Sequence, residues 1–290
     1  MRYHIVHRTT YRYSQAVELE PHLVRLRPRS DLFQTLHAFA LVVDPPAAHT
    51  TEQVDLDGNN LLHLRFTGQT DRLTITATST VETHCTNPFV YILEPWATHL
   101  PIDYPSSLLT QLQPYLNSLT PGHNGPDPAA TQLAYEVAHA NQDNVVALLS
   151  DLNQRIYKDC EHQIRDTGAP FPPGLTWQQK TGSCRDFTVL FMAVCRKLGL
   201  ASRFVSGYQE GDPDSDDRHL HAWVEVYLPG AGWRGYDPTH GLVVAAGNVA
   251  LVASPYPHLC APISGQFRGQ GVNSEMSYEL TITHLDKAAP

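Results

Sequence analysis

Residues 182–199 read GSCRDFTVLFMAVCRKLG, and the helix in this stretch is easy to place. Its apolar side chains recur at the spacing of one helix face: Phe187, Leu190, Phe191, Val194, Cys195 and Leu198. Such a stripe is typical of a helix whose apolar face is buried. Ser183 is a good N-cap, Asp186 three residues later resembles a capping box, and Gly199 follows the last apolar position. The pattern therefore predicts a buried helix with Cys184 in its first turn.

Cys184 is placed where a thiol ionises readily. A helix N-terminus presents unpaired N–H groups and partial positive charge, and both stabilise a thiolate. Gly182 leaves room for a substrate backbone to approach, and the same N–H groups can hold the oxyanion of an acyl-transfer intermediate. Position alone is weak support, because a lone cysteine at a helix start is more often structural. Cys195 lies on the apolar face and is interpreted as core packing.

A histidine and a carboxylate follow on predicted strands. Three strands are predicted, at Ser202–Tyr208, His221–Leu228 and Trp233–Tyr236. The turn Pro229–Gly232 joins the last two strands as a hairpin. If Glu225 faces Trp233 in this hairpin, His221 lies opposite Asp237. A carboxylate beside an imidazole fixes its tautomer, and the imidazole can carry the proton of a nucleophilic thiol. We therefore predict a catalytic triad of Cys184, His221 and Asp237.

Residues 1–95 carry the pattern of many short strands. Leu73–Thr78 alternates strictly between apolar and polar positions, and Asp57–Asn60 is a turn signal between two strand-like runs. Short strands at close spacing are typical of an antiparallel sandwich. We predict an α+β fold, with an antiparallel β-sandwich over residues 1–95 and a catalytic unit over residues 96–290.

The catalytic unit begins with a helical connector. Prolines punctuate the first part of residues 96–160, and Pro128–Tyr157 then carries apolar residues at helical spacing. This run is predicted as one helix. The last strand signal is Ser277–His284.

Composition excludes several classes of function. The 290 residues carry a net charge of -9 without a run of Lys or Arg, so neither nucleic acid nor an anionic membrane is an expected partner. No stretch is apolar enough for a transmembrane helix, and Met1–Arg8 lacks the apolar core of a signal peptide, so a cytoplasmic protein is expected. The five cysteines are widely spaced and odd in number, which argues against a disulfide framework.

Two features suggest metal binding, but for each of them an interpretation without a metal is favoured. Asp212, Asp214, Asp216 and Asp217 lie in an acidic loop, Glu210–Asp217. Counted from Asp212, the sixth and twelfth positions, where an EF-hand needs Gly and Glu, are Asp217 and Trp223. We interpret it as a solvated loop, and because it precedes His221, a role in gating the site is left open. His219 and His221 have the spacing of paired ligands on a strand, without further clustered ligands. We predict no metal and no cofactor.

Four segments match a known family: 182–187 (GSCRDF), 195–208 (CRKLGLASRFVSGY), 221–233 (HAWVEVYLPGAGW) and 236–239 (YDPT). Together they resemble the bacterial transglutaminase-like superfamily, whose mechanism is similar to that of papain-type cysteine proteases. The resemblance covers about residues 150–245, and residues 1–95 resemble the β-rich region that precedes this core in one bacterial subfamily. It implies a papain-like core in which the nucleophile helix packs on an antiparallel sheet.

The resemblance also implies roles. Cys184 would be the nucleophile, His221 the general base and acid, and Asp237 the orienting carboxylate. An oxyanion side-chain donor is expected before the cysteine, and Trp177 and Gln178 both carry suitable N–H groups. Trp223 either lines the substrate cleft or packs in the core.

The expected function is cysteine-dependent hydrolysis of an amide bond, or acyl transfer from it, on a peptide or protein through a thioester. Hydrolysis is favoured because a cytoplasmic setting offers water as the acceptor. The alternatives are a peptide-binding or assembly module that kept the fold without catalysis and, with less support, a metal-dependent hydrolase. The sequence leaves the oligomeric state open.

Overall fold

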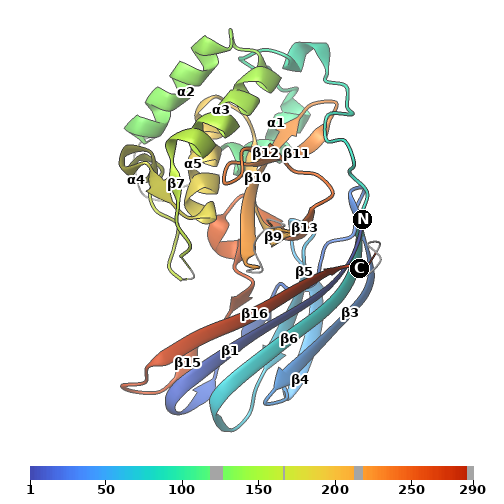
Figure 1. Ribbon diagram of the computed structural model, residues 1–290, viewed down its shortest axis with the longest axis vertical. Helices are drawn as coiled ribbons and strands as arrows, with labels where there is room; N and C mark the ends of the chain where they lie inside the picture. The colour runs from blue at the N-terminus through green and yellow to red at the C-terminus, as the bar shows by residue number, and fades with distance from the viewer. Residues whose placement is uncertain (118–126, 166, 212–217, 286–290) are drawn as a thin grey trace.

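The computed structural model describes residues 1–117, 127–165, 167–211 and 218–285 (Figure 1). Two antiparallel sheets form the lower part of the molecule in Figure 1, and the helices gather with a third sheet above them. The α+β architecture predicted from the sequence is confirmed. Among the described residues, no helix is long and apolar enough to cross a membrane.

The first N-terminal sheet contains the longest strands of the protein. Its strands are β1 (Arg2–Leu19), β3 (Gln34–Asp44), β6 (Gln69–Thr83), β15 (Phe267–Arg268) and β16 (Ser274–His284). The order is β15–β1–β6–β3, and β16 also pairs with β1. Alternate residues of β6, including Leu73, Ile75 and Ala77, are buried, as the strict alternation in this stretch predicts.

The second N-terminal sheet packs beside the first. It consists of β14 (Ile263–Ser264), β2 (His22–Val24), β5 (Asn60–Arg65) and β4 (His49–Val54), in that order. The predicted turn joins β4 to β5, with Gly58 at a φ of 77° that side chains rarely adopt.

The C-terminal end of the chain returns to the N-terminal sheets. β16 pairs with β1 along its length, from Tyr3 opposite His284 to Tyr13 opposite Ser274, and β14 pairs with β2. The division into residues 1–95 and 96–290 therefore does not follow the sheets. A strand pattern is local and does not reveal its partner, so the strand predicted at Ser277–His284 could not be assigned to this sheet from the sequence.

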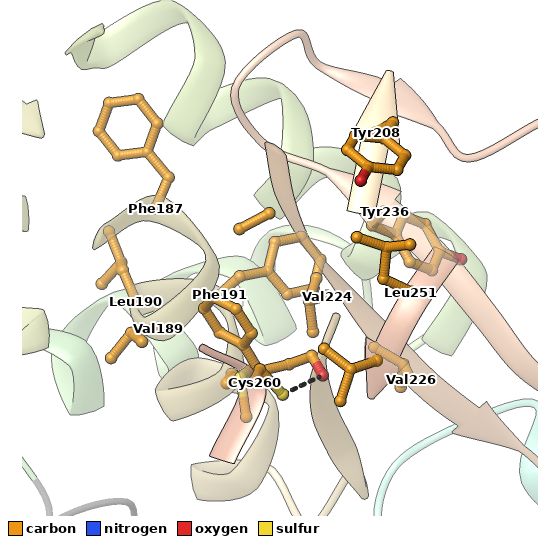
Figure 2. Close-up of a cluster of buried hydrophobic side chains, with 14 of the residues drawn as sticks. Phe187, Val189, Leu190, Phe191, Tyr208, Val224, Val226, Tyr236, Leu251 and Cys260 are labelled. Carbon is orange, nitrogen blue, oxygen red and sulfur yellow. Dashed lines mark hydrogen bonds between the residues drawn. The ribbon is translucent and has the colours of Figure 1, made fainter. Parts of the chain in front are cut away.

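The core sheet carries the candidate site. Its order is β12 (Leu242–Val243), β11 (Gly232–Asp237), β10 (Leu220–Leu228), β9 (Ser202–Gln209) and β13 (Asn248–Ser254). Helix α5 (Cys184–Lys197) packs on β10 and β9. Figure 2 shows side chains of this helix, such as Leu190 and Phe191, in one cluster with Val224 and Val226 of β10. The predicted helix face is thus the face that covers the sheet.

The remaining elements surround α5. They are η1 (Pro95–Ala97), α1 (Ser106–Leu116), α2 (Pro128–Ala140), α3 (Val145–Asp159), β7 (Glu161–His162), α4 (Pro173–Gln179), β8 (Thr181–Gly182) and η2 (Pro257–Cys260). The single helix predicted over Pro128–Tyr157 is wrong. Gln142 and Asp143 have φ values of 52° and 60°, which end α2, and the Asn144 side chain caps α3 by accepting from Ala147 N–H. Apolar spacing continues across the break because both helices bury a face.

Candidate active site

The start of α5 is held by one buried carboxylate. Asp186 Oδ2 accepts hydrogen bonds from Ser183 N–H at 2.7 Å and from the Ser183 hydroxyl at 2.8 Å. Asp186 Oδ1 accepts from Arg165 Nη2 and from Phe171 N–H, both at 2.6 Å. The capping interaction predicted between Ser183 and Asp186 is present, and it also ties the segment containing Arg165 and Phe171 to the helix start. Cys184, the first residue of α5, is fixed by this arrangement.

His221 and Asp237 meet in the core sheet. His221 Nε2 lies 2.7 Å from Asp237 Oδ2, and both side chains are buried. The Nε2 atom is therefore engaged by the carboxylate, which leaves Nδ1 for the thiol. The backbone N–H of Thr239 donates to the other carboxylate oxygen at 3.0 Å and fixes its orientation.

The hairpin register differs from the one predicted. Glu225 pairs with Gly235, and Trp233 pairs with Tyr227, so the strands are shifted by two residues from the expected alignment. A shift of two keeps every side chain on its predicted face, because strand side chains alternate with a period of two. His221 and Asp237 are consequently diagonal neighbours rather than directly opposite, and their side chains still reach each other.

The Cys184 thiol is more acidic than an ordinary thiol. Burial opposes ionisation, but hydrogen bonding to His162 and His221, the nearby His221 charge and the Ala222 backbone N–H outweigh burial and lower the pKa to about 6. The other four cysteines behave in the opposite way. Burial raises the pKa of Cys85, Cys160, Cys195 and Cys260.

His221 is held in its charged form. Burial disfavours the imidazolium, but the Asp237 carboxylate and the Cys184 thiolate outweigh burial and raise the pKa of His221 to about 10. The same pairing holds the pKa of Asp237 well below its usual range, against the effect of burial. The geometry therefore favours a thiolate–imidazolium pair supported by a buried carboxylate.

His162 is a neighbour of the thiol that sequence reasoning missed. It lies in β7, which pairs in parallel with β8, so that His162 stands beside Gly182. Its ring also contacts the Phe187 ring at 6.1 Å between centroids. No local signal marks His162, because a two-residue strand and its partner cannot be recognised from periodicity.

His240 was also missed. Its Nδ1 lies 2.9 Å from Asp237 Oδ2, so one carboxylate oxygen accepts from two histidines. The ligand-type atoms of His221, Asp237 and His240 lie within 4.8 Å of one another, the spacing of a candidate metal cluster. The two hydrogen bonds account for this proximity without an ion. A histidine three residues after the predicted carboxylate was the available signal.

Other predicted site residues lie elsewhere. Trp177 and Gln178 are on α4 and are not among the described residues that line the cavity around Cys184; Lys180 Nζ lies over the Trp177 ring at 2.8 Å. Trp223 is 1% exposed and packs with Val205 and Ala253, so it belongs to the core rather than the cleft.

The structure describes the predicted histidine pair, His219 and His221, but not most of the acidic loop. His219 Nδ1 contacts the Tyr278 hydroxyl, and His219 is not in the described group of His221, Asp237 and His240. Residues 212–217 of the acidic loop, with its four aspartates, lie outside the described residues.

A cavity of about 620 Å³ opens in front of Cys184. His162, His221 and His240 line it together with the thiol. Its walls come from three separate parts of the chain: the core, the N-terminal sandwich, and the segment 257–263. A site of this volume can enclose most of a small ligand or part of a peptide.

Comparison with known proteins places this geometry in a family. The family model of the transglutaminase-like superfamily matches residues 131–238, and that of the bacterial transglutaminase-like N-terminal region matches residues 3–82. An uncharacterized Mycobacterium tuberculosis protein is 32% identical over 260 residues, which cover 84% of this chain and 80% of that protein. The chain belongs to the transglutaminase-like superfamily. Both regions that the sequence resembled are thereby confirmed.

Two further proteins that are similar to this chain carry functional descriptions. A Cytophaga hutchinsonii structure, described as a candidate cysteine protease, superposes with a TM-score of 0.73 at 21% identity, covering 100% of this chain and 92% of that one. This likeness shows the shared fold across both parts. A Pseudomonas aeruginosa protein-glutamine gamma-glutamyltransferase is 29% identical over 133 residues, covering 43% of this chain and 20% of that enzyme.

Proposed function

We propose that the protein is a cysteine-dependent enzyme that cleaves an amide bond of a peptide or protein and passes through a thioester on Cys184. The observation that carries the proposal is the arrangement of His221 and Asp237 at 2.7 Å beside a thiol whose pKa is lowered to about 6. A thiolate–imidazolium pair at a helix start that also lines a cavity is typical of a catalytic site, whereas cysteines that only pack in the core have raised pKa values.

The first half of the reaction uses three groups of the chain. The Cys184 thiolate attacks the amide carbonyl, and a carbon–sulfur bond forms while the carbonyl electrons move to oxygen. The N-terminal N–H groups of α5 stabilise that oxyanion. His221 then gives its proton to the leaving amine as the carbon–nitrogen bond breaks, and Asp237 keeps the ring oriented.

The second half decides between hydrolysis and transfer. Neutral His221 takes a proton from the acceptor, which attacks the thioester and releases the thiolate. Water yields an acid, and a primary amine yields a new amide. The resemblance to a gamma-glutamyltransferase over part of the chain supports transfer, whereas the likeness to a candidate cysteine protease shows only the fold.

The test is mass spectrometry of the intact protein mixed with glutamine-containing and other peptides, with and without a primary amine. We expect an acyl adduct on Cys184 and release of amine or ammonia, both lost in Cys184→Ala and retained in Cys195→Ala. Peptide binding that survives Cys184→Ala, without turnover of any peptide, would instead support a binding module. Activity that depends on a metal found by elemental analysis would support the hydrolase built on His221, Asp237 and His240.

A further inference from the structure

The sandwich contributes a wall to the cavity of the catalytic core. Tyr11 of β1 and Met276 and Tyr278 of β16 line the same cavity as Cys184. Tyr11 is the cross-strand partner of Met276, and Tyr278 is the partner of Thr9, so the three side chains share one face of adjacent strands. We call Tyr11, Met276 and Tyr278 the sandwich patch.

The sandwich patch is held against the core. The Tyr278 hydroxyl contacts His219 Nδ1, two residues before His221. Deeper in the interface, His7 Nδ1 lies 3.0 Å from the Tyr208 hydroxyl. The distance between the patch and Cys184 is therefore set by contacts that link β1 to β9 and β16 to His219, the residue before β10, not by a loose contact between two units.

Apolar side chains line much of the rest of the cavity. Phe204, Leu220 and Ile263 contribute from the core and from β14. None of the described lining residues is Asp or Glu. A wall of aromatic, aliphatic and thioether groups gains most from a ligand that removes apolar surface from water.

The cations at the wall are already engaged. Arg165 is paired with Asp186 at 2.6 Å. Arg185 Nη1 donates to the Gly168 carbonyl at 2.9 Å, its Nη2 donates to the Arg165 carbonyl, and Arg218 also has a partner. Arg165 is thus balanced by a carboxylate, and donors of Arg185 are occupied by backbone carbonyls. The sandwich patch itself offers aromatic and thioether surface, which suits an apolar group.

We propose that the substrate presents a bulky apolar or aromatic side chain beside the amide that Cys184 attacks, and that this side chain packs on the sandwich patch. The proposal rests on the proposed function, since it names the substrate class of that site. The N-terminal region, together with the returning strand β16, thereby determines specificity.

Two alkylating probes that share a reactive group test this selectivity. Acetyl-phenylalanyl and acetyl-glycyl chloromethyl ketones both react as the Cys184 sulfur bonds to the methylene carbon and chloride leaves. Only the first probe carries a bulky apolar side chain. We expect it to react about 10- to 100-fold faster, the range expected for burying one such group. The ratio of the two rates cancels changes in thiol reactivity.

Neighbouring residues of β16 provide a matched pair of variants. Met276→Asp places a carboxylate in the cavity, whereas Ser277→Asp places one on the opposite face of the strand, which lines a separate polar hollow. We expect the phenylalanyl-to-glycyl ratio to fall at least tenfold in Met276→Asp and to stay unchanged in Ser277→Asp. Met276→Ala, which adds no charge, should lower the ratio by a smaller factor.

The outcomes separate the two proposals. Equal rates for both probes in the wild type, or equal ratios in Met276→Asp and Ser277→Asp, would overturn the sandwich patch as a specificity wall. Iodoacetamide, which has no side chain to place, reports the thiol alone. If its labelling of Cys184 has an ordinary midpoint, both proposals fall. If the midpoint is low and the probes do not discriminate, only the inference about the patch falls.

Discussion

Replacing Asp237 with Asn removes a charge and leaves the shape of the side chain. In the wild type, one oxygen of Asp237 accepts from His221 at 2.7 Å and from His240 at 2.9 Å. The carboxylate is the main group that keeps the buried His221 protonated. Without it, burial favours the neutral ring, and the Cys184 thiolate loses its neighbouring positive charge. We therefore expect the pKa of Cys184 to rise toward its ordinary value.

The expected change in the alkylation rate follows from the pKa of the Cys184 thiol. A pKa lowered from 9.0 to about 6 corresponds to about 4 kcal/mol in favour of the thiolate. At pH 7 about 90% of such a thiol is ionised, against about 1% of an ordinary one. A thiolate of low pKa is, however, intrinsically about 15- to 30-fold less nucleophilic. Simple alkylation at pH 7 should therefore fall only about 3- to 6-fold in Asp237→Asn.

Amide turnover should respond far more strongly than alkylation. It also needs His221 to deliver a proton to the leaving amine, so we expect Asp237→Asn to lower it by about 10³- to 10⁴-fold. We therefore predict that Asp237→Asn lowers amide turnover far more than it lowers the alkylation rate. A triad whose carboxylate only supported the fold would lose both activities together.

The assay is the rate of iodoacetamide labelling of Cys184 between pH 4 and pH 10, followed by mass spectrometry. Because burial raises the pKa of the other four cysteines, Cys184 should react alone at low pH. We expect a midpoint near pH 6 in the wild type and one roughly two to three pH units higher in Asp237→Asn.

Asp151→Asn is the control, since Asp151 is a partly exposed carboxylate that pairs with Arg155 and Asn141 and does not line the cavity. Its labelling midpoint should equal that of the wild type. The reasoning is refuted if Asp237→Asn labels with the wild-type midpoint, or if the wild type itself titrates near pH 9.

Three more predictions concern neighbouring residues. His162→Gln should raise the labelling midpoint of Cys184 by about one pH unit, because His162 helps to lower the thiol pKa. Burial lowers the pKa of His7 from 6.5 to about 4, so the unfolded chain binds the proton first as the pH falls. Wild-type stability should therefore drop by up to about 3 kcal/mol between pH 6.5 and pH 4, and His7→Gln should remove this part of the loss in urea unfolding. Asp186→Asn should cost about 3–5 kcal/mol in the same measurement, because it leaves a buried network without its charge.

Each of these three has its own contrary outcome. An unchanged midpoint in His162→Gln would mean that His221 alone sets the thiol pKa. Identical pH dependence of unfolding in His7→Gln and the wild type would mean that His7 can be protonated in the folded state without cost. Asp151→Asn should cost no more than about 1 kcal/mol, and an equal loss in Asp186→Asn would remove the distinction between the fully buried and the partly exposed carboxylate.

Much of the site could be predicted because its signals are local. The stripe on α5, the Ser183 cap and the strand of His221 depend on residues within a few positions of one another. The hairpin between β10 and β11 is also short, so the pairing of His221 with Asp237 survived an error of two residues in register. An error of one residue would have put the two side chains on opposite faces.

The parts that escaped prediction depend on contacts across the chain. His162 reaches the thiol through a two-residue parallel strand, and Trp223, on a strand of the site, turns into the core instead. The break in Pro128–Tyr157 depends on two residues with positive φ, neither of which is glycine. Apolar spacing reports which faces are buried and not where the backbone turns.

The helix that begins at Cys184 and the two strands that carry His221 and Asp237 could be predicted from the sequence alone, because capping and periodicity act over a few residues. The family could be recognised from four short motif segments. The groups that surround the thiol and the walls that enclose the cavity come from segments far apart in the chain, so they appear only in the folded structure. The strand β16, near the end of the chain, pairs with β1 at its beginning and brings Met276 and Tyr278 to Cys184. The choice between strand partners so far apart is made by the packing of whole sheets, which no local pattern records.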